Sequence, residues 1–292
     1  MKKFIYLIFI ILTMLTFSLS NEINNVSISN SYMLSSEQSV TDNHSFNAIS
    51  NPAMLAFNSQ IGYLLEYNKL FYYAQSNFDS IGFLIGKKAF GIVINNFSSG
   101  KISIKDIEGI NTGQTIDYSL TSFNFAAAIR FTFNKSGNLA GGITGIVNWE
   151  RINVETITYD ANFGLVYNYE NKNACLRLGT VIKNISSKNT ATYHCGVSIK
   201  SGSLFIICGY ENKFINSLNE KIKLAAMLDL PVFYSIIKNI SFGVGYLFST
   251  QNYIQQLTFG LSINFKIVSL NYSFATHQYL GSSQNFRIGI EL

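Results

Sequence analysis

The last eight residues of the sequence, Asn285 to Leu292, alternate between polar and apolar side chains up to the final position. Successive side chains of an extended strand point to opposite faces, so Phe286, Ile288, Ile290 and Leu292 share one face. An uncovered strand with one apolar face aggregates in water, whereas a closed barrel pairs that strand with its first one. The stretch therefore favours a barrel. The alternative is an amphipathic edge strand of a soluble sandwich.

The two-residue period runs through most of the sequence from residue 58 onward. Its clearest stretch is 122–133, where aromatic and aliphatic residues alternate with small or polar ones. A polar break at Lys87-Lys88 indicates a tight turn, and longer polar stretches near 105–115, 184–191, 211–219 and 276–283 indicate loops. Short turns that alternate with longer loops, between about fourteen strands of about ten residues, are typical of membrane barrels. We predict an all-β, antiparallel, up-and-down transmembrane barrel over residues 58–292.

The composition agrees with a membrane barrel. Charged residues make up 13% of the sequence, against roughly 25% in ordinary globular domains. Aromatic residues make up 14%, and no second apolar run as long as a spanning helix occurs. The hydrophobicity is therefore distributed along alternating strands. A net charge of +5 is too small to indicate a nucleic-acid partner.

The first twenty residues have the features of a cleaved signal peptide. Lys2 and Lys3 are followed by an apolar stretch from Phe4 to Phe17 and by the small residues Ser18 and Ser20. The alternative is a membrane anchor, but the apolar stretch is shorter than the about twenty residues that a spanning helix needs. We predict export to the outer membrane of a bacterial cell, with residues 1–20 removed. Residues 21–57 are then an N-terminal plug or hatch segment.

The alternation also assigns the two faces of the wall. The apolar face contacts lipid, and the other face lines a polar lumen. The charged and amide residues predicted to point inward are Asn68, Asn124, Arg130, Asn148, Asn168, Glu170, Arg177, Lys183, Lys223 and Asp229. Composition alone does not decide whether the lumen is open or filled by residues 21–57.

No catalytic, cofactor or metal motif is visible. The histidines lie in unrelated segments without metal-ligand spacing. No nucleophile elbow, P-loop or dinucleotide fingerprint occurs. The three cysteines, Cys175, Cys195 and Cys208, lie in strand-like runs, and whether two of them pair is left open. We predict a protein that is not an enzyme and that has no cofactor.

Several segments resemble known outer-membrane barrels. The motif Asn51-Pro52-Ala53 before an aromatic strand resembles the hatch-to-barrel junction of FadL-like barrels and of the PorV/PorQ family. The segments Phe90–Phe97, Asp106–Gly109, Gly179–Ile185 and Phe259–Phe274, together with the final strand, are similar to PorQ. This resemblance implies a fourteen-stranded barrel of the type IX secretion system. It also implies that the final strand, with Phe286, Ile288, Ile290 and Leu292, is the membrane-insertion signal.

Two functions follow as hypotheses. The first is a docking or anchoring component of the type IX cargo-attachment machinery, which binds a secretion-system protein through its external loops. The alternative is a FadL-like transporter that moves a hydrophobic ligand across the outer membrane. Membrane lipid is the expected partner of the outer face in both cases.

Overall fold

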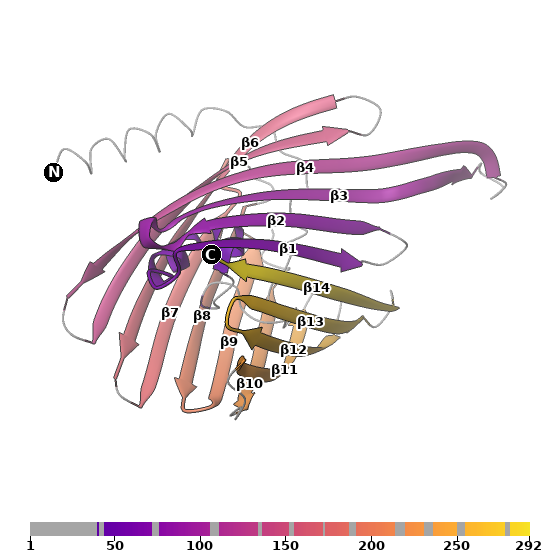
Figure 1. Ribbon diagram of the computed structural model, residues 1–292. Helices are drawn as coiled ribbons and strands as arrows, with labels where there is room; N and C mark the ends of the chain where they lie inside the picture. The colour runs from indigo at the N-terminus through magenta and orange to yellow at the C-terminus, as the bar shows by residue number, and fades with distance from the viewer. Residues whose placement is uncertain are drawn as a thin grey trace, which may run out of the picture.

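Fourteen antiparallel β-strands close into a ring in the computed structural model of the chain (Figure 1). The structure describes residues 40, 44–71, 76–105, 111–133, 136–151, 155–171, 173–186, 191–213, 220–230, 236–249, 255–277 and 281–292. The strands are β1 (Tyr63–Phe71), β2 (Asn77–Ile85), β3 (Phe90–Lys105), β4 (Asn111–Thr132), β5 (Gly137–Arg151), β6 (Glu155–Glu170), β7 (Ala174–Lys183), β8 (Thr192–Ser201), β9 (Leu204–Lys213), β10 (Lys221–Leu230), β11 (Ile237–Ser249), β12 (Gln255–Phe265), β13 (Val268–His277) and β14 (Gly281–Glu291). The predicted all-β barrel and its strand number are confirmed.

The ring closes where β1 pairs with β14, and we call this strand pair the seam. Tyr67 lies opposite Ile288 in the antiparallel register. Tyr63 N donates a hydrogen bond to Leu292 O at 3.2 Å, and Leu292 N donates to Tyr63 O at 2.9 Å. The final strand therefore has a hydrogen-bonded neighbour on both sides. This closed ladder removes the edge that an open sheet would leave.

The two faces of the wall differ as the alternation predicts. On β14, Phe286 and Ile288 are 43% and 47% exposed on the outer face. On the inner face of the seam, Asn68 and Asn285 are buried. An apolar outer wall around a polar interior suits a barrel in a lipid bilayer and indicates an outer-membrane location. Arg130 and Glu170 follow the inward register but lie near strand ends, where they are exposed.

Asn68 points into the lumen as predicted, and it pairs with Arg287 on one side and with Ser80 on the other. One connection differs from the prediction. The predicted loop at 105–115 is largely strand, since β3 extends to residue 105 and β4 begins at residue 111.

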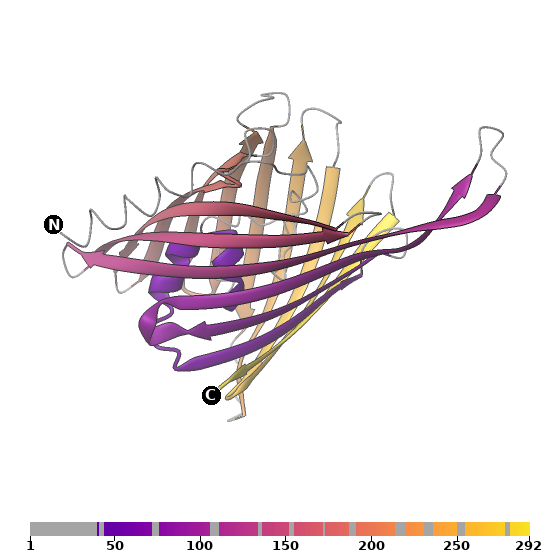
Figure 2. The same ribbon diagram turned by 90° about the horizontal axis from the view of Figure 1, so that it is seen from above.

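The hairpin of β3 and β4 projects well beyond the other strands (Figures 1 and 2). Pairing of β3 with β2 ends at Ser98, and pairing of β4 with β5 begins at Ser119. Past these positions β3 and β4 pair only with each other among the described residues, from Lys101 opposite Asp117 to Lys105 opposite Asn111. We call this two-stranded extension the ribbon. The opposite end of the barrel carries short connections such as η5 (Gly86–Lys88), and β14 also ends there. We call this end of the barrel the turn end.

A short irregular segment before β1 lies inside the barrel, where Figure 2 shows its indigo turns enclosed by the strands. We call residues 44–57 the luminal segment. It consists of η2 (His44–Phe46), α2 (Asn47–Ser50) and η3 (Pro52–Phe57). Phe46 and Leu55 are fully buried against inward residues of the wall, which include Leu84 and Val93. Among the residues that the structure describes, no helix is long and apolar enough to cross a membrane.

Candidate functional site

The luminal segment occupies a seat formed by glycines of the inner wall. A Cβ on Gly142 of β5 would lie 2.5 Å from Ala53 N, and a Cβ on Gly164 of β6 would overlap Asn51 Oδ1. Gly142 and Gly164 are opposite each other in the β5–β6 register. Only residues without a side chain at these two positions allow the backbone of the segment to approach so closely. The structure thus places the predicted Asn51-Pro52-Ala53 motif in the lumen, against β5 and β6.

Local hydrogen bonds hold the motif in its conformation. Asn51 caps η3, because its Oδ1 accepts a hydrogen bond from Ala53 N at 3.1 Å, and Pro52 occupies the first position of the turn. The Asn51 side chain also donates to Thr180 O of β7 at 3.4 Å. Earlier in the luminal segment, Ala48 O accepts a hydrogen bond from the Thr144 hydroxyl of β5. These bonds connect the luminal segment to strands on one side of the barrel.

A buried carboxylate fastens the segment to the seam. Ser45 donates to Glu66 Oε2 through its backbone N–H at 2.9 Å and also through its hydroxyl. Arg287 Nε lies 3.8 Å from Glu66 Oε1, and all three residues are buried. A Cβ on Gly82 would overlap Ser45 Oγ, so this glycine leaves the space that Ser45 occupies. The segment therefore has two attachments, one at the β5–β6 seat and one at the seam.

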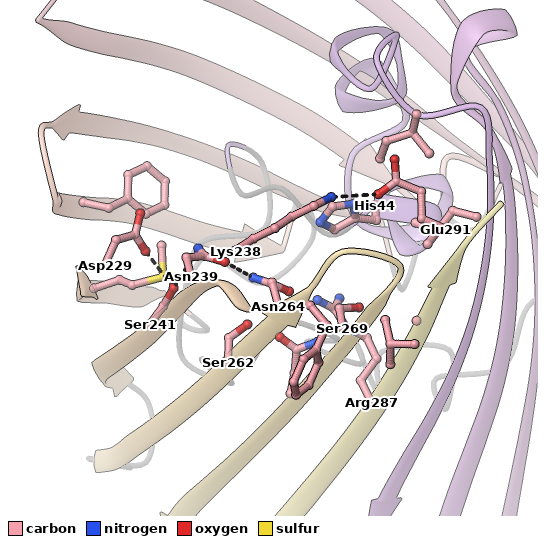
Figure 3. A pocket seen from close by; sticks show the side chains of 18 of the residues that line it. His44, Asp229, Lys238, Asn239, Ser241, Ser262, Asn264, Ser269, Arg287 and Glu291 are labelled. Atoms are coloured by element: carbon pink, nitrogen blue, oxygen red, sulfur yellow. Dashed lines mark hydrogen bonds and ion pairs between the residues drawn. The ribbon is translucent and has the colours of Figure 1, made fainter. Parts of the chain in front are cut away.

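A cavity of about 400 Å³ lies beside the segment toward the turn end (Figure 3). Its polar side comes from strands late in the chain. Asn264 donates to Asn239 Oδ1 at 2.7 Å, and Lys238 lies 3.7 Å from Glu291. Ser241 donates to Asp229 at 2.7 Å. The close-up shows these side chains pointing into one space together with His44 of the luminal segment.

The cavity has a second, apolar side. Phe205 and Ile207 of β9 line it together with Met227 of β10. Ile207 and Met227 are buried, and both pack with Val40, which precedes the luminal segment. Because most other inward positions of β7 to β14 are polar, this apolar patch stands apart from its surroundings. The cavity can therefore bind a molecule that has an apolar body and a polar end.

A separate cluster of charged side chains lies on the inner wall, near the end of the barrel opposite the turn end. Glu211 of β9 accepts from Lys223 at 2.7 Å and from Lys221 at 2.8 Å, and His194 lies 3.6 Å away. Glu211, Lys223 and His194 are buried. The cluster connects β8, β9 and β10, and Lys221 and Lys223 compensate the buried charge of Glu211.

The remaining candidates from the sequence have structural places. The three cysteines are thiols, and Cys175 donates to Asn168 Oδ1 at 3.2 Å. Phe286, Ile288, Ile290 and Leu292 are all exposed on the outer wall. Within the described ranges, no group of three or more His, Cys, Asp or Glu side chains is arranged to hold a metal ion.

The sequence prediction placed Arg177 and Asp229 of the cavity in the lumen, but it missed Glu66, Arg287 and the apolar patch. Glu66 and Arg287 are isolated charges at inward positions near the middle of the first and last strands. Two opposite charges on strands that must pair to close a barrel are a signal that could have identified this ion pair. No comparable signal marks the apolar patch, because its members come from two strands and from a segment distant in sequence.

Solved structures that align with most of this chain include proteins named as hydrocarbon channels or transporters. The Pseudomonas putida toluene transporter TodX aligns with a TM-score of 0.56 at 10% identity, over 87% of this chain and 94% of that chain. The CymD monoaromatic hydrocarbon channel aligns with a TM-score of 0.55 at 9% identity, over 86% and 94%. No protein-family model and no curated protein matches the sequence. The fourteen-stranded barrel fold is confirmed, and the FadL-like and PorV/PorQ resemblances stay predictions.

Proposed function

We propose that this barrel carries a small hydrophobic molecule across the outer membrane, as the alternative hypothesis from the sequence expects. The observation that supports it is the apolar patch of Phe205, Ile207 and Met227 in the cavity beside the luminal segment. The structural neighbours are named as channels or transporters of monoaromatic hydrocarbons and toluene. None of these names is that of an enzyme.

The luminal segment would act as the plug of this channel. It fills the barrel beside β3 to β6, and its contacts with the seat and the seam hold it there. The cavity lies on the turn-end side, which corresponds to the periplasmic side in barrels of this class. A hydrophobic molecule that reached it would rest on the apolar patch, and the hydrogen-bonded groups opposite would orient any polar end.

We expect the Met227→Glu variant to bind an apolar probe at least about tenfold more weakly, since burying an unpaired carboxylate costs more than 1.4 kcal/mol. The measurement is a fluorescence titration of the purified, delipidated barrel with 1-N-phenylnaphthylamine. The Met227→Leu variant keeps the volume and polarity of the site and should bind like the unmodified protein. Equal binding by the glutamate variant, or no binding by the unmodified barrel, would refute the proposed transport function.

A second candidate function is the docking of a secretion-system partner, which the PorQ-like segments imply. The ribbon favours it, because its two strands, which within the described part of the chain pair only with each other, present backbone edges outside the barrel. Such edges suit a partner that adds an extended strand. Docking and transport use different parts of the molecule, so they can be tested separately.

Replacing residues 100–117 with an Asn-Gly turn is expected to remove docking and to leave the barrel intact. The Ser98–Ser119 pair remains in register, and Asn-Gly suits a two-residue hairpin. The measurement is cargo attachment in cells that carry the shortened protein, with heat-modifiable gel mobility as the control for folding. If cargo stays attached while the shortened barrel is folded, the ribbon has no role in docking.

The remaining predictions from the sequence belong to this proposal. We infer export through cleavage of residues 1–20, a plug within residues 21–57, and an insertion signal in the final strand. Residues 1–39 and 41–43 lie outside the described part of the chain. Mass spectrometry of the mature protein tests the cleavage site directly.

A further inference from the structure

The outer wall carries an apolar groove of about 620 Å³ across β5 to β10. Its centre is formed by small outward residues on three neighbouring strands, Thr180, Cys195 and Cys208. Larger apolar and aromatic residues surround them, and these are Leu139, Leu165, Tyr167, Leu178, Val197, Tyr210 and Ile222. The centre of the groove therefore has small side chains, whereas large side chains are exposed on most strands of the outer wall.

The strand register explains why the wall is hollow here. Thr180 lies opposite Cys195, and Cys208 lies opposite Val197, one step along the same two-residue period. The three small side chains therefore form a diagonal line across β7, β8 and β9. Gly179, Gly196 and Gly209 are opposite one another on these strands and also line the groove. Small outward side chains next to glycine backbone make the wall thin at this place.

The groove lies at the depth of the hydrocarbon layer. The strands β7, β8, β9 and β10 have ten residues each, which is close to the length that crosses a bilayer. Leu178, Val197 and Cys208 are near the middle of their strands. Leu224 lies opposite Cys208 at this level, Ile199 and Ile206 are opposite each other one outward step away, and all three are exposed apolar residues. The occupant must therefore be apolar.

We propose that the groove is a binding site for one acyl chain of a membrane lipid. An extended hydrocarbon chain has the shape of a narrow apolar groove and needs no hydrogen-bond partner there. A second copy of this protein fits less well, because a two-fold axis through the groove would place hollow against hollow and leave both unfilled. The site lies outside the barrel and is independent of the luminal cavity, so it goes beyond the proposed transport function.

The test uses the Cys195→Leu/Cys208→Phe double variant, which fills the hollow with apolar side chains. Purified barrels are delipidated, titrated with dipalmitoyl phosphatidylethanolamine and separately with palmitate, and analysed by native mass spectrometry. We expect the unmodified barrel to retain one phospholipid and the double variant to show occupancy at least about tenfold lower, since each buried methylene adds several-fold to binding. The Ala127→Phe variant places a large residue on the outer wall outside the groove and should retain the lipid like the unmodified protein.

Heat-modifiable mobility confirms that each variant is folded, and the single variant Thr180→Leu replaces the double variant if the latter does not fold. Equal lipid retention by a folded groove variant, or none by the unmodified barrel, overturns the proposal. Retention of palmitate alone also overturns it, because the ligand would then be a free acid. A dimer that the groove variant dissociates would identify a second copy as the occupant instead. The Met227→Glu variant should keep the lipid, which separates this result from the test of transport.

Discussion

Replacing Gly142 with leucine is expected to drive the luminal segment out of its seat. The new side chain would point inward from β5 into the backbone of Pro52 and Ala53, where a Cβ alone already lies 2.5 Å from Ala53 N. Overpacking a well-packed site costs about 1–3 kcal/mol, and a collision with backbone lies at or above the upper end of that range. The measurement is protease cleavage within residues 44–57, which should change from resistant to rapid in the folded barrel.

The matched control for this change is Gly145→Leu in the same strand. Gly145 points outward, and a Cβ there meets nothing within 4 Å. The same leucine would add apolar surface to a lipid-facing wall, so the luminal segment should stay protected. Planar-bilayer conductance gives a second readout, because an expelled segment would leave a wider pore. Cleavage at equal rates in both variants would show that the seat does not hold the segment.

Replacing Arg287 with leucine is expected to destabilise the barrel by about 3–5 kcal/mol, the cost of leaving a buried charge without its partner. Glu66 would keep its hydrogen bonds from Ser45 but would lose the cation 3.8 Å away. The measurement is the urea midpoint of unfolding in lipid vesicles. The Glu66→Gln/Arg287→Leu double variant removes both charges and should recover part of the lost stability.

The control is Lys238→Leu, which removes an ion pair with Glu291 at 3.7 Å. Both side chains of that pair are about half exposed, with 54% for Lys238 and 42% for Glu291. Exposed pairs contribute about 0–1 kcal/mol, so the midpoint should move little. If Arg287→Leu shifted the midpoint no more than Lys238→Leu, the Glu66–Arg287 pair would have no special role at the seam.

The wall of this barrel could be predicted from the sequence, because the alternation of polar and apolar residues is a local pattern. Phe123 and Phe125 lie on one face whatever else the chain does, and short turns such as Lys87-Lys88 mark where a strand ends. The polar residues near 105–115 misled the prediction, since a two-stranded extension of polar residues resembles a loop until the pairing of β3 with β4 is known.

The candidate site was harder to predict, because its contacts join distant parts of the chain. The seat needs Gly142 and Gly164 to meet Asn51, and nothing in either stretch indicates the other. Each glycine taken alone indicates only a weakened strand. The apolar patch likewise depends on Val40 reaching Met227. Pairwise proximity of this kind follows from closure of the ring and not from any local pattern.

Closure of the ring also has a consequence for the order of assembly. The seam joins strands from opposite ends of the barrel sequence, so its formation carries the largest loop-closure entropy of any strand pair, and neighbouring hairpins can form first. The residues that cradle Asn51 and Pro52 belong to β5 and β6, which are adjacent hairpin partners. An incomplete, curved sheet could therefore capture the luminal segment early. Pairing of the last strand would then close the barrel around a luminal segment that is already bound.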